Sequence, residues 1–274
     1  MFLTTPTARR RRAAAAVVTA ALLVPLAAAC GSDKDSAGAK AASPSGGSGS
    51  APKAAQLTVL AASSLTDVFK AAGAAYEKEN PGTHVKFSFA GSQELAAQVK
   101  QGAPADALVT ADTKTMDGLK SDVNDSSIIA RNRLVVVAGK GNPKKIEGLK
   151  SLSSDTLKVV LAASQVPVGR YSKQVLDAQE ITVKPVSQEP NVRAVLSKVE
   201  LGEADAGIVY KTDAASAKGK VDTIDIPDAQ NAVAKYPAAT LKTSKNSVAA
   251  AAFVKWLSSP EAQKILTDAG FQQP

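Results

Sequence analysis

From residue 56 to the C-terminus, short apolar runs typical of β-strands alternate with segments of helical periodicity. The strand-like runs are 57–62, 85–90, 107–111, 134–138, 159–163, 206–210 and 221–226. The helical segments are 65–79, 93–101, 170–178, 192–201, 247–257 and 260–269. This alternation predicts an α/β fold. The continuously apolar runs 134–137 and 159–161 predict central parallel strands covered on both faces.

Composition excludes several kinds of site. His84 is the only histidine and Cys30 the only cysteine, so one chain can form neither a zinc site rich in His and Cys nor an internal disulfide. His84 alternates with apolar neighbours, which places it on the polar face of a strand. Phe253 and Trp256 are three residues apart on a helix, so we expect Trp256 to pack in the core.

The net charge of +8 overstates the basic character of the working protein. Arg9 to Arg12 contribute four of the 33 basic residues and precede the first acidic residue, Asp33. The rest of the excess is weak and spread along the chain, whereas nucleic-acid binding calls for a clustered basic stripe. We therefore expect no nucleic-acid partner.

Residues 1–29 are typical of an export signal peptide. Arg9 to Arg12 form its positive start, and the apolar stretch 13–29 is broken at Pro25 and shorter than the ~20 residues that a membrane-spanning helix needs. A buried core helix is the alternative. Residues 26–30 (Leu-Ala-Ala-Ala-Cys) resemble the lipobox of bacterial lipoproteins, which implies lipid attachment at Cys30. An ordinary cysteine beside a nearby cleavage site remains the alternative.

Residues 30–55 are predicted to form a disordered tether. After Cys30 the segment contains no Ile, Leu, Val, Met or aromatic residue, so it cannot bury enough apolar surface to offset the entropy of ordering. We expect an exported protein that is anchored by lipid on the outer face of the cell membrane.

Several predicted helices begin where a strand or a turn ends. Ser64 and Ser92 follow strands, Val168 follows a strand and Pro167, and Val192 follows Pro190-Asn191. Helix starts carry free N–H groups and a positive dipole end, and ligands of open α/β sheets bind outside the carboxyl ends of strands. The alternative for each serine is that it only caps its helix.

The chain resembles the periplasmic molybdate-binding proteins of ABC importers over essentially all of 56–274. The resemblance rests on Ala-Ala-Ser-Ser-Leu-Thr-Asp at 61–67, Phe-Ala-Gly-Ser at 89–92, Val-Pro-Val-Gly at 166–169 and Asn-Val-Arg at 191–193. It continues through Gly-Ile-Val-Tyr at 207–210, Tyr-Pro at 236–237 and the terminal pattern 259–271.

The resemblance implies a two-lobed type II binding-protein fold with a ligand cleft between the lobes and two interlobe crossovers, near 135–140 and 230–238. One lobe would comprise 56–136 plus 237–274, and the other 137–236. The positions that match the family's ligand residues are Ser64, Ser92, Val168, Val192 and Tyr210. Val168 stands where the family often has Ala. We expect Arg193 and Lys173 to be solvated rather than ligands.

These observations predict a monomeric substrate-binding lipoprotein that captures molybdate, and tungstate with it, for an ABC permease and its ATPase. It would need no cofactor or metal cation and would not be an enzyme. A binder of another oxyanion such as sulfate is the first alternative. An anchored hydrolase using Ser64 or Ser92 and a pure surface-interaction module are the others.

Overall fold

The computed structural model describes residues 54–274. The predicted signal peptide 1–29, Cys30 and the tether as far as residue 53 lie outside the described residues. Strand β1 begins at Ala55, the last residue assigned to the tether. Within 54–274, no helix combines the length and apolar character needed to cross a bilayer.

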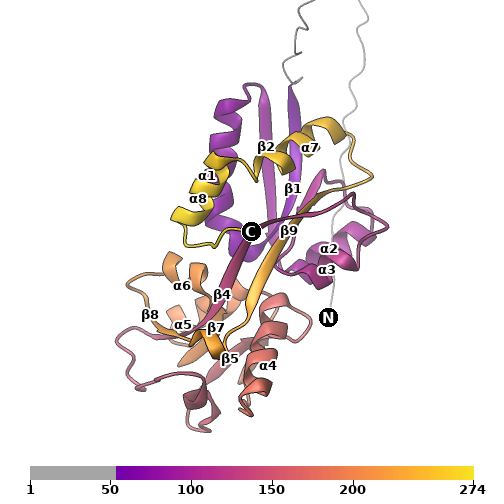
Figure 1. Cartoon of the computed structure of the whole chain (residues 1–274). Coiled ribbons are helices and arrows are strands. Elements are labelled where there is room, and N and C mark those ends of the chain that lie inside the picture. The colour runs from indigo at the N-terminus through magenta and orange to yellow at the C-terminus, as the bar shows by residue number, and fades with distance from the viewer. Residues whose placement is uncertain (1–53) are drawn as a thin grey trace, which may run out of the picture. The chain divides into compact units, whose positions relative to one another are not determined.

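The described part of the chain alternates strands and helices as predicted (Figure 1). Its strands are β1 (Ala55–Ala62), β2 (Thr83–Ala90), β3 (Ala107–Val109), β4 (Ser127–Gly139), β5 (Val159–Ala162), β6 (Ser187–Glu189), β7 (Ala206–Tyr210), β8 (Val221–Asp225) and β9 (Val233–Thr240). Its α-helices are α1 (Thr66–Glu79), α2 (Ser92–Lys100), α3 (Thr113–Asp117), α4 (Pro167–Ala178), α5 (Val192–Glu200), α6 (Lys211–Ser216), α7 (Ser247–Trp256) and α8 (Pro260–Asp268). The short 3-10 helices are η1 (Ser63–Leu65), η2 (Leu149–Ser153) and η3 (Asp228–Gln230).

The molecule has two lobes, and the long adjacent strands β4 and β9 of its sheet connect them. The strand order of the sheet is β2-β1-β3-β9-β4-β7-β5-β6, and β8 pairs with β4. We call β1–β3 with α1–α3, α7 and α8 the first lobe, and β5–β8 with α4–α6 the second lobe. Figure 1 shows β4 and β9 running between them. The α/β, two-lobed fold with two crossovers is therefore confirmed.

Strand β4 changes partners along its length. Residues 127–133 pair with β9, whereas residues 134–139 pair with β7 and β8. β9 follows β8 of the second lobe and pairs with β3 of the first. The passage between lobes thus falls at Arg133 and Leu134 in β4. The lobe limits 136/137 and 236/237 inferred from the sequence remain predictions.

The direction predicted for the apolar run 134–137 is wrong. The run is central and buried, but β4 is antiparallel to β7, β8 and β9. Val159–Ala162, by contrast, is parallel to both of its neighbours. An apolar run indicates that a strand is buried on both faces, but burial does not determine whether the strand runs parallel or antiparallel to its neighbours. β4 enters the second lobe from the first, so it opposes the strands that helices connect within the second lobe.

The core is mainly aliphatic, as the composition requires. A large cluster of buried residues extends through both lobes, and a smaller one, which includes Leu60, Leu95 and Leu108, lies between the first-lobe sheet and α2 and α3. Trp256 packs against Tyr76 and Phe253 and donates from Nε1 to Glu79 at 2.9 Å, so it is a packing residue as expected. His84 is exposed on β2, also as expected.

Candidate functional site

A small cavity lies where helix starts of the two lobes meet. All five predicted ligand residues line it: Ser64 and Ser92 from the first lobe, and Val168, Val192 and Tyr210 from the second. The remaining lining residues are Ala62, Ser63, Gly91, Ala111, Val166 and Pro167. The structure thus brings together residues that are up to 146 positions apart in the sequence (Ser64 and Tyr210). Their role as ligands remains a prediction.

The cavity is small and is lined without charged side chains. Its volume is about 10 Å³, room for about one water molecule and far below the roughly 300–1,000 Å³ of typical pockets for drug-sized ligands. The polar side chains of its lining are hydroxyls of serine and tyrosine. A compact ligand with several acceptor atoms matches such a lining.

Backbone N–H groups add to these donors because helices begin at the cavity. Helix α2 begins at Ser92 and α5 at Val192, and the first N–H groups of a helix have no partner within it. In α5 the Asn191 side chain accepts from the N–H of Ala194 at 3.0 Å, whereas the N–H of Val192 has no partner among residues 54–274 and is free for the cavity. The positive dipole ends of these helices favour an anion there.

Helix α4 reaches the cavity through an unusually close approach to β5. Pro167, its first residue, has no N–H, so Val168 offers the first one. A Cβ at Gly169 would lie 2.1 Å from the carbonyl oxygen of Ala163 and 2.6 Å from that of Ala162. Only glycine therefore allows the start of α4 to sit against the end of β5.

Neither serine acts as a helix cap, so the capping alternative is wrong for both. Gly91 is the N-cap of α2 and Leu65 that of α1, and neither cap involves a serine side chain. Instead, Ser92 Oγ accepts from the backbone N–H of Ala111 at 3.0 Å. Because an N–H can only donate, the hydroxyl proton of Ser92 is free for another acceptor, and the cavity adjoins it.

Tyr210 is buried, and its hydroxyl has no hydrogen-bond partner within 54–274. Burial, reinforced by the neighbouring Tyr236 and Tyr171 and by the carboxylates of Asp112 and Asp213, raises the pKa of Tyr210 well above its usual value. The phenol therefore keeps its proton at neutral pH. A buried unpaired hydroxyl is costly unless a ligand satisfies it, which suits a donor to a bound anion.

Contacts across the cleft hold the two lobes together beside the cavity. Arg170 of α4 donates to Oδ2 of Asp112, the N-cap of α3, from Nε at 2.9 Å and also from Nη2. Arg170 Nη2 also donates to Thr115 Oγ1. Gln93 Nε2 donates to the carbonyl oxygen of Pro190 at 2.8 Å. The lobes are therefore joined by polar contacts on the rim of the cavity.

Arg193 differs from the expectation of a solvated cation. Its side chain is only 25% exposed and lies between Asp67 of the first lobe, at 2.7 Å, and Asp213 of the second, at 2.6 Å. Burial alone would lower the pKa of Arg193, but the two carboxylates outweigh it and raise that pKa. Lys173 is exposed and pairs with Asp177. Neither cation lines the cavity.

Two further residues near the site, Asn132 and Tyr236, had no predicted role as ligands. Tyr236 is fully buried and its hydroxyl lies 3.0 Å from Ser64 Oγ. The Tyr-Pro pair at 236–237 was part of the resemblance, but nothing in the sequence places its hydroxyl beside Ser64. Asn132 lies in β4, in a segment that the strand prediction did not include.

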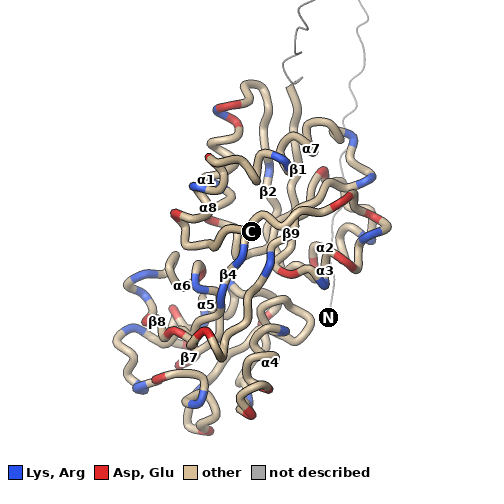
Figure 2. Tube along the Cα trace, in the orientation of Figure 1, with Lys and Arg blue, Asp and Glu red and all other residues tan. Residues whose placement is uncertain are grey.

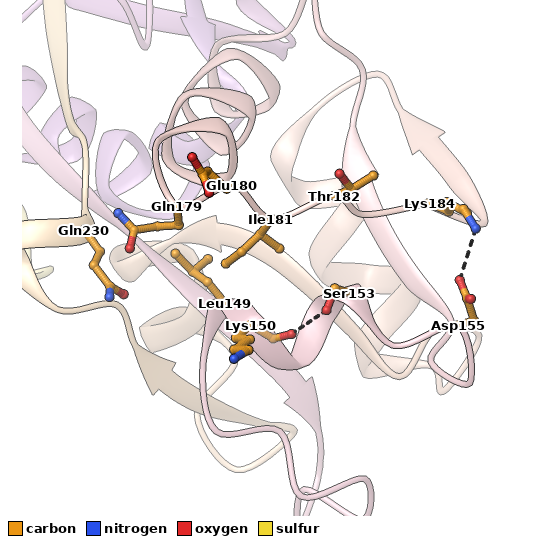
Figure 3. A pocket seen from close by; sticks show the side chains of 10 residues that line it. All are labelled: Leu149, Lys150, Ser153, Asp155, Gln179, Glu180, Ile181, Thr182, Lys184 and Gln230. Atoms are coloured by element: carbon orange, nitrogen blue, oxygen red, sulfur yellow. Dashed lines mark hydrogen bonds and ion pairs between the residues drawn. The ribbon is translucent and has the colours of Figure 1, made fainter.

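A wider hollow of about 650 Å³ lies on the second lobe, away from the helix starts (Figure 3). Leu149 and Ile181 form an apolar floor, and charged and polar side chains surround it. Among these, Lys184 and Asp155 form an exposed ion pair at 3.4 Å. None of the predicted ligand residues lines this hollow, so the interlobe cavity is the candidate site.

Comparisons with known proteins agree with this fold. The family model of bacterial extracellular solute-binding proteins matches residues 57–272. The molybdate-binding protein ModA of Mycobacterium bovis is 39% identical over 249 residues, which cover 90% of this chain and 92% of that protein. The periplasmic molybdate-binding protein of Azotobacter vinelandii superimposes with a TM-score of 0.70 at 23% identity, over 80% of this chain and 99% of the other. The sulfate-binding protein SubI of Mycobacterium tuberculosis superimposes with a TM-score of 0.72 at 20% identity, over 80% of this chain and 87% of the other. At these low identities, the two solved structures show only that the fold is shared. The chain belongs to the bacterial extracellular solute-binding protein family.

Proposed function

We propose that this protein captures molybdate, and tungstate with it, outside the cytoplasm and delivers it to an ABC importer. The observation that carries the proposal is the convergence of Ser64, Ser92, Val168, Val192 and Tyr210 on one small cavity without charged side chains. The 39% identity to a molybdate-binding protein over nine tenths of the chain supports the same ligand.

A cavity lined with neutral donors suits a fully deprotonated dianion. Molybdate and sulfate carry no proton at neutral pH, so every one of their oxygens accepts. Phosphate retains a proton, which would need an acceptor such as a carboxylate, and no carboxylate lines the cavity. Neutral donors also avoid leaving a buried cation unpaired when the site is empty. Sulfate differs from molybdate in size, so discrimination between them falls to the dimensions of the cavity.

The partners follow from the role of a solute-binding protein. A permease and its ATPase would receive the ligand, and closure of the lobes on the ligand would be the state that the permease recognises. We place the protein outside the cell membrane, monomeric and held by lipid at Cys30. The tether would let the folded lobes move near the membrane surface.

The hydrolase alternative lacks the groups that it needs. Activation of Ser64 or Ser92 would require a neighbouring base, and neither histidine nor carboxylate lines the cavity. His84, the only histidine, is exposed on β2. We therefore propose a binding protein rather than an enzyme.

Calorimetric titration of the purified protein with molybdate, tungstate, sulfate and phosphate tests the proposal. Hydrogen bonds to charged groups contribute about 1.5–3 kcal/mol each, so several of them support a dissociation constant of about 1 μM or below for molybdate. We expect binding of molybdate and tungstate only. Binding of sulfate alone would favour the sulfate alternative, and no heat with any of the four would reject an oxyanion ligand.

A further inference from the structure

The buried hydroxyl of Tyr236 lies beside the hydroxyl of Ser64. Tyr236 Oη is 3.0 Å from Ser64 Oγ, and by geometry alone either oxygen could be the donor. Tyr236 belongs to β9 and Asn132 to β4, the two strands that run between the lobes. The contacts of Asn132 decide the direction of the hydrogen bond.

The orientation of the Asn132 amide is fixed by the backbone. Asn132 Oδ1 accepts from the N–H of Arg133 at 2.9 Å, so this atom must be the oxygen. Nδ2 therefore points the other way, where it donates to Thr212 Oγ1 at 2.8 Å and, at 3.5 Å, to the hydroxyl of Tyr236. An amide nitrogen cannot accept, so Tyr236 cannot donate to Asn132.

Only one direction satisfies every proton in this chain of contacts. If Ser64 donated to Tyr236, the phenol proton would have no acceptor among the described residues, in a site where Tyr236 is fully buried. If Tyr236 donates to Ser64, its own proton is satisfied and the proton of Ser64 is left for the cavity. Burial also raises the pKa of Tyr236, so the phenol keeps its proton. Ser92 has the equivalent arrangement, with the N–H of Ala111 as donor.

We propose that Asn132 and Tyr236 form a donor relay that fixes Ser64 as a hydrogen-bond donor to the bound anion. Tyr236 is thus a positioning residue: it acts through Ser64 and does not line the cavity itself. The relay rests on the proposed function, since it needs an anion that accepts from Ser64. It gives the site a preference for ligands that carry no proton, because Ser64 then offers its own proton to a ligand oxygen that must accept it.

A double-mutant cycle on the full chain, with molybdate affinity measured by calorimetry, tests the relay. Tyr236→Phe removes the hydroxyl and keeps the ring, which packs against Tyr210 and Phe271. We expect it to weaken molybdate binding about five- to tenfold in the wild-type background and less than about twofold in the Ser64→Ala background. Tyr76→Phe, at a buried tyrosine outside the cavity, is the matched control and should change neither.

The outcomes separate the relay from the proposed function. If Ser64→Ala leaves the affinity unchanged, Ser64 is not a ligand, and both the site assignment and the relay fail. If Ser64→Ala weakens binding but Tyr236→Phe does not, the relay alone is overturned. Equal losses from Tyr236→Phe in both backgrounds would mean a general structural role and would also overturn it. Circular dichroism and thermal unfolding of each ligand-free variant establish that it is folded.

Discussion

At the scale of single residues, the site depends on where hydroxyl protons are forced to go. Ser92 accepts from a backbone N–H, and Tyr210 is buried without a partner among the described residues. Each therefore offers a proton to the cavity in the absence of ligand. When the lobes close on an anion, these hydroxyl donors need little reorientation, so little side-chain ordering entropy is lost on binding. Such preorganisation favours tight binding without a charged side chain.

Ser92→Ala tests this at one residue. We expect molybdate affinity to fall at least about tenfold, because a hydrogen bond to a charged group is lost, which contributes about 1.5–3 kcal/mol. Calorimetry gives the affinity. Ser88→Ala, at an exposed serine of β2, is the control and should leave it unchanged. An unaltered affinity in a folded Ser92→Ala variant would remove Ser92 from the site.

At the scale of elements, the site depends on helix starts that belong to different lobes. Helix α2 and η1 approach from the first lobe, and α4 and α5 from the second. Their N–H groups converge only when the lobes touch. The contact of Arg170 with Asp112 joins α4 to the N-cap of α3, and it therefore favours the arrangement in which the donors meet. Figure 2 shows basic and acidic residues interspersed over both lobes, so specific pairs of this kind matter more than net charge.

Arg170→Met tests the interlobe contact. The side chains of Arg170 and Asp112 are 22% and 5% exposed, so water screens the pair only partly. Its loss should make closure of the two lobes less favourable by about 1 kcal/mol. We expect molybdate affinity to fall about fivefold. Lys173→Met, on the same helix, removes an exposed pair with Asp177 within α4 and should change affinity less than about twofold. Equal affinities for the Arg170 variant and the wild type, measured by calorimetry, would contradict the interpretation.

At the scale of the whole molecule, most elements are predictable because buried strands and amphipathic helices leave regular patterns. The exceptions have physical causes. Strand β9 contains Pro237 and the exposed Lys235, which interrupt an apolar run, yet it pairs with β3 and β4. The first half of β4 carries Arg131 and Arg133 and so does not read as an apolar run. Short segments such as β6 and α6 are too brief for a period to be recognised.

The candidate site could be predicted only in part. The sequence locates individual helix starts, and the resemblance selected five residues, but their convergence depends on the pairing of β4 and β9 across 100 residues. Asn132 meets Tyr236 through this pairing, and Tyr236 in turn reaches Ser64. The partners of Arg193 likewise come from α1 and α6, which no local pattern connects.

The Asp67–Arg193–Asp213 cluster links both lobes and makes the stability of the protein depend on pH. Asp213 is fully buried, and burial raises its pKa to about 6, although Arg193 opposes the shift. In the unfolded chain the pKa would be close to 3.8. Between about pH 4 and 6 the folded protein therefore holds a proton that the unfolded chain releases. The contribution of Asp213 to the free energy of unfolding is present below this window and is lost as the pH rises through it.

Asp213→Asn, which replaces the titrating group with a neutral one of similar shape, should remove this dependence. We expect the free energy of unfolding of the wild type, relative to the variant, to fall by on the order of 3 kcal/mol between about pH 4 and 7, from the shift of the Asp213 pKa. Urea unfolding at a series of pH values measures it. Asp177→Asn, at an exposed carboxylate on α4, should instead run parallel to the wild type. Parallel profiles for Asp213→Asn and the wild type would mean that Asp213 is ionised throughout, held by Arg193 as a permanent ion pair at the junction of the lobes.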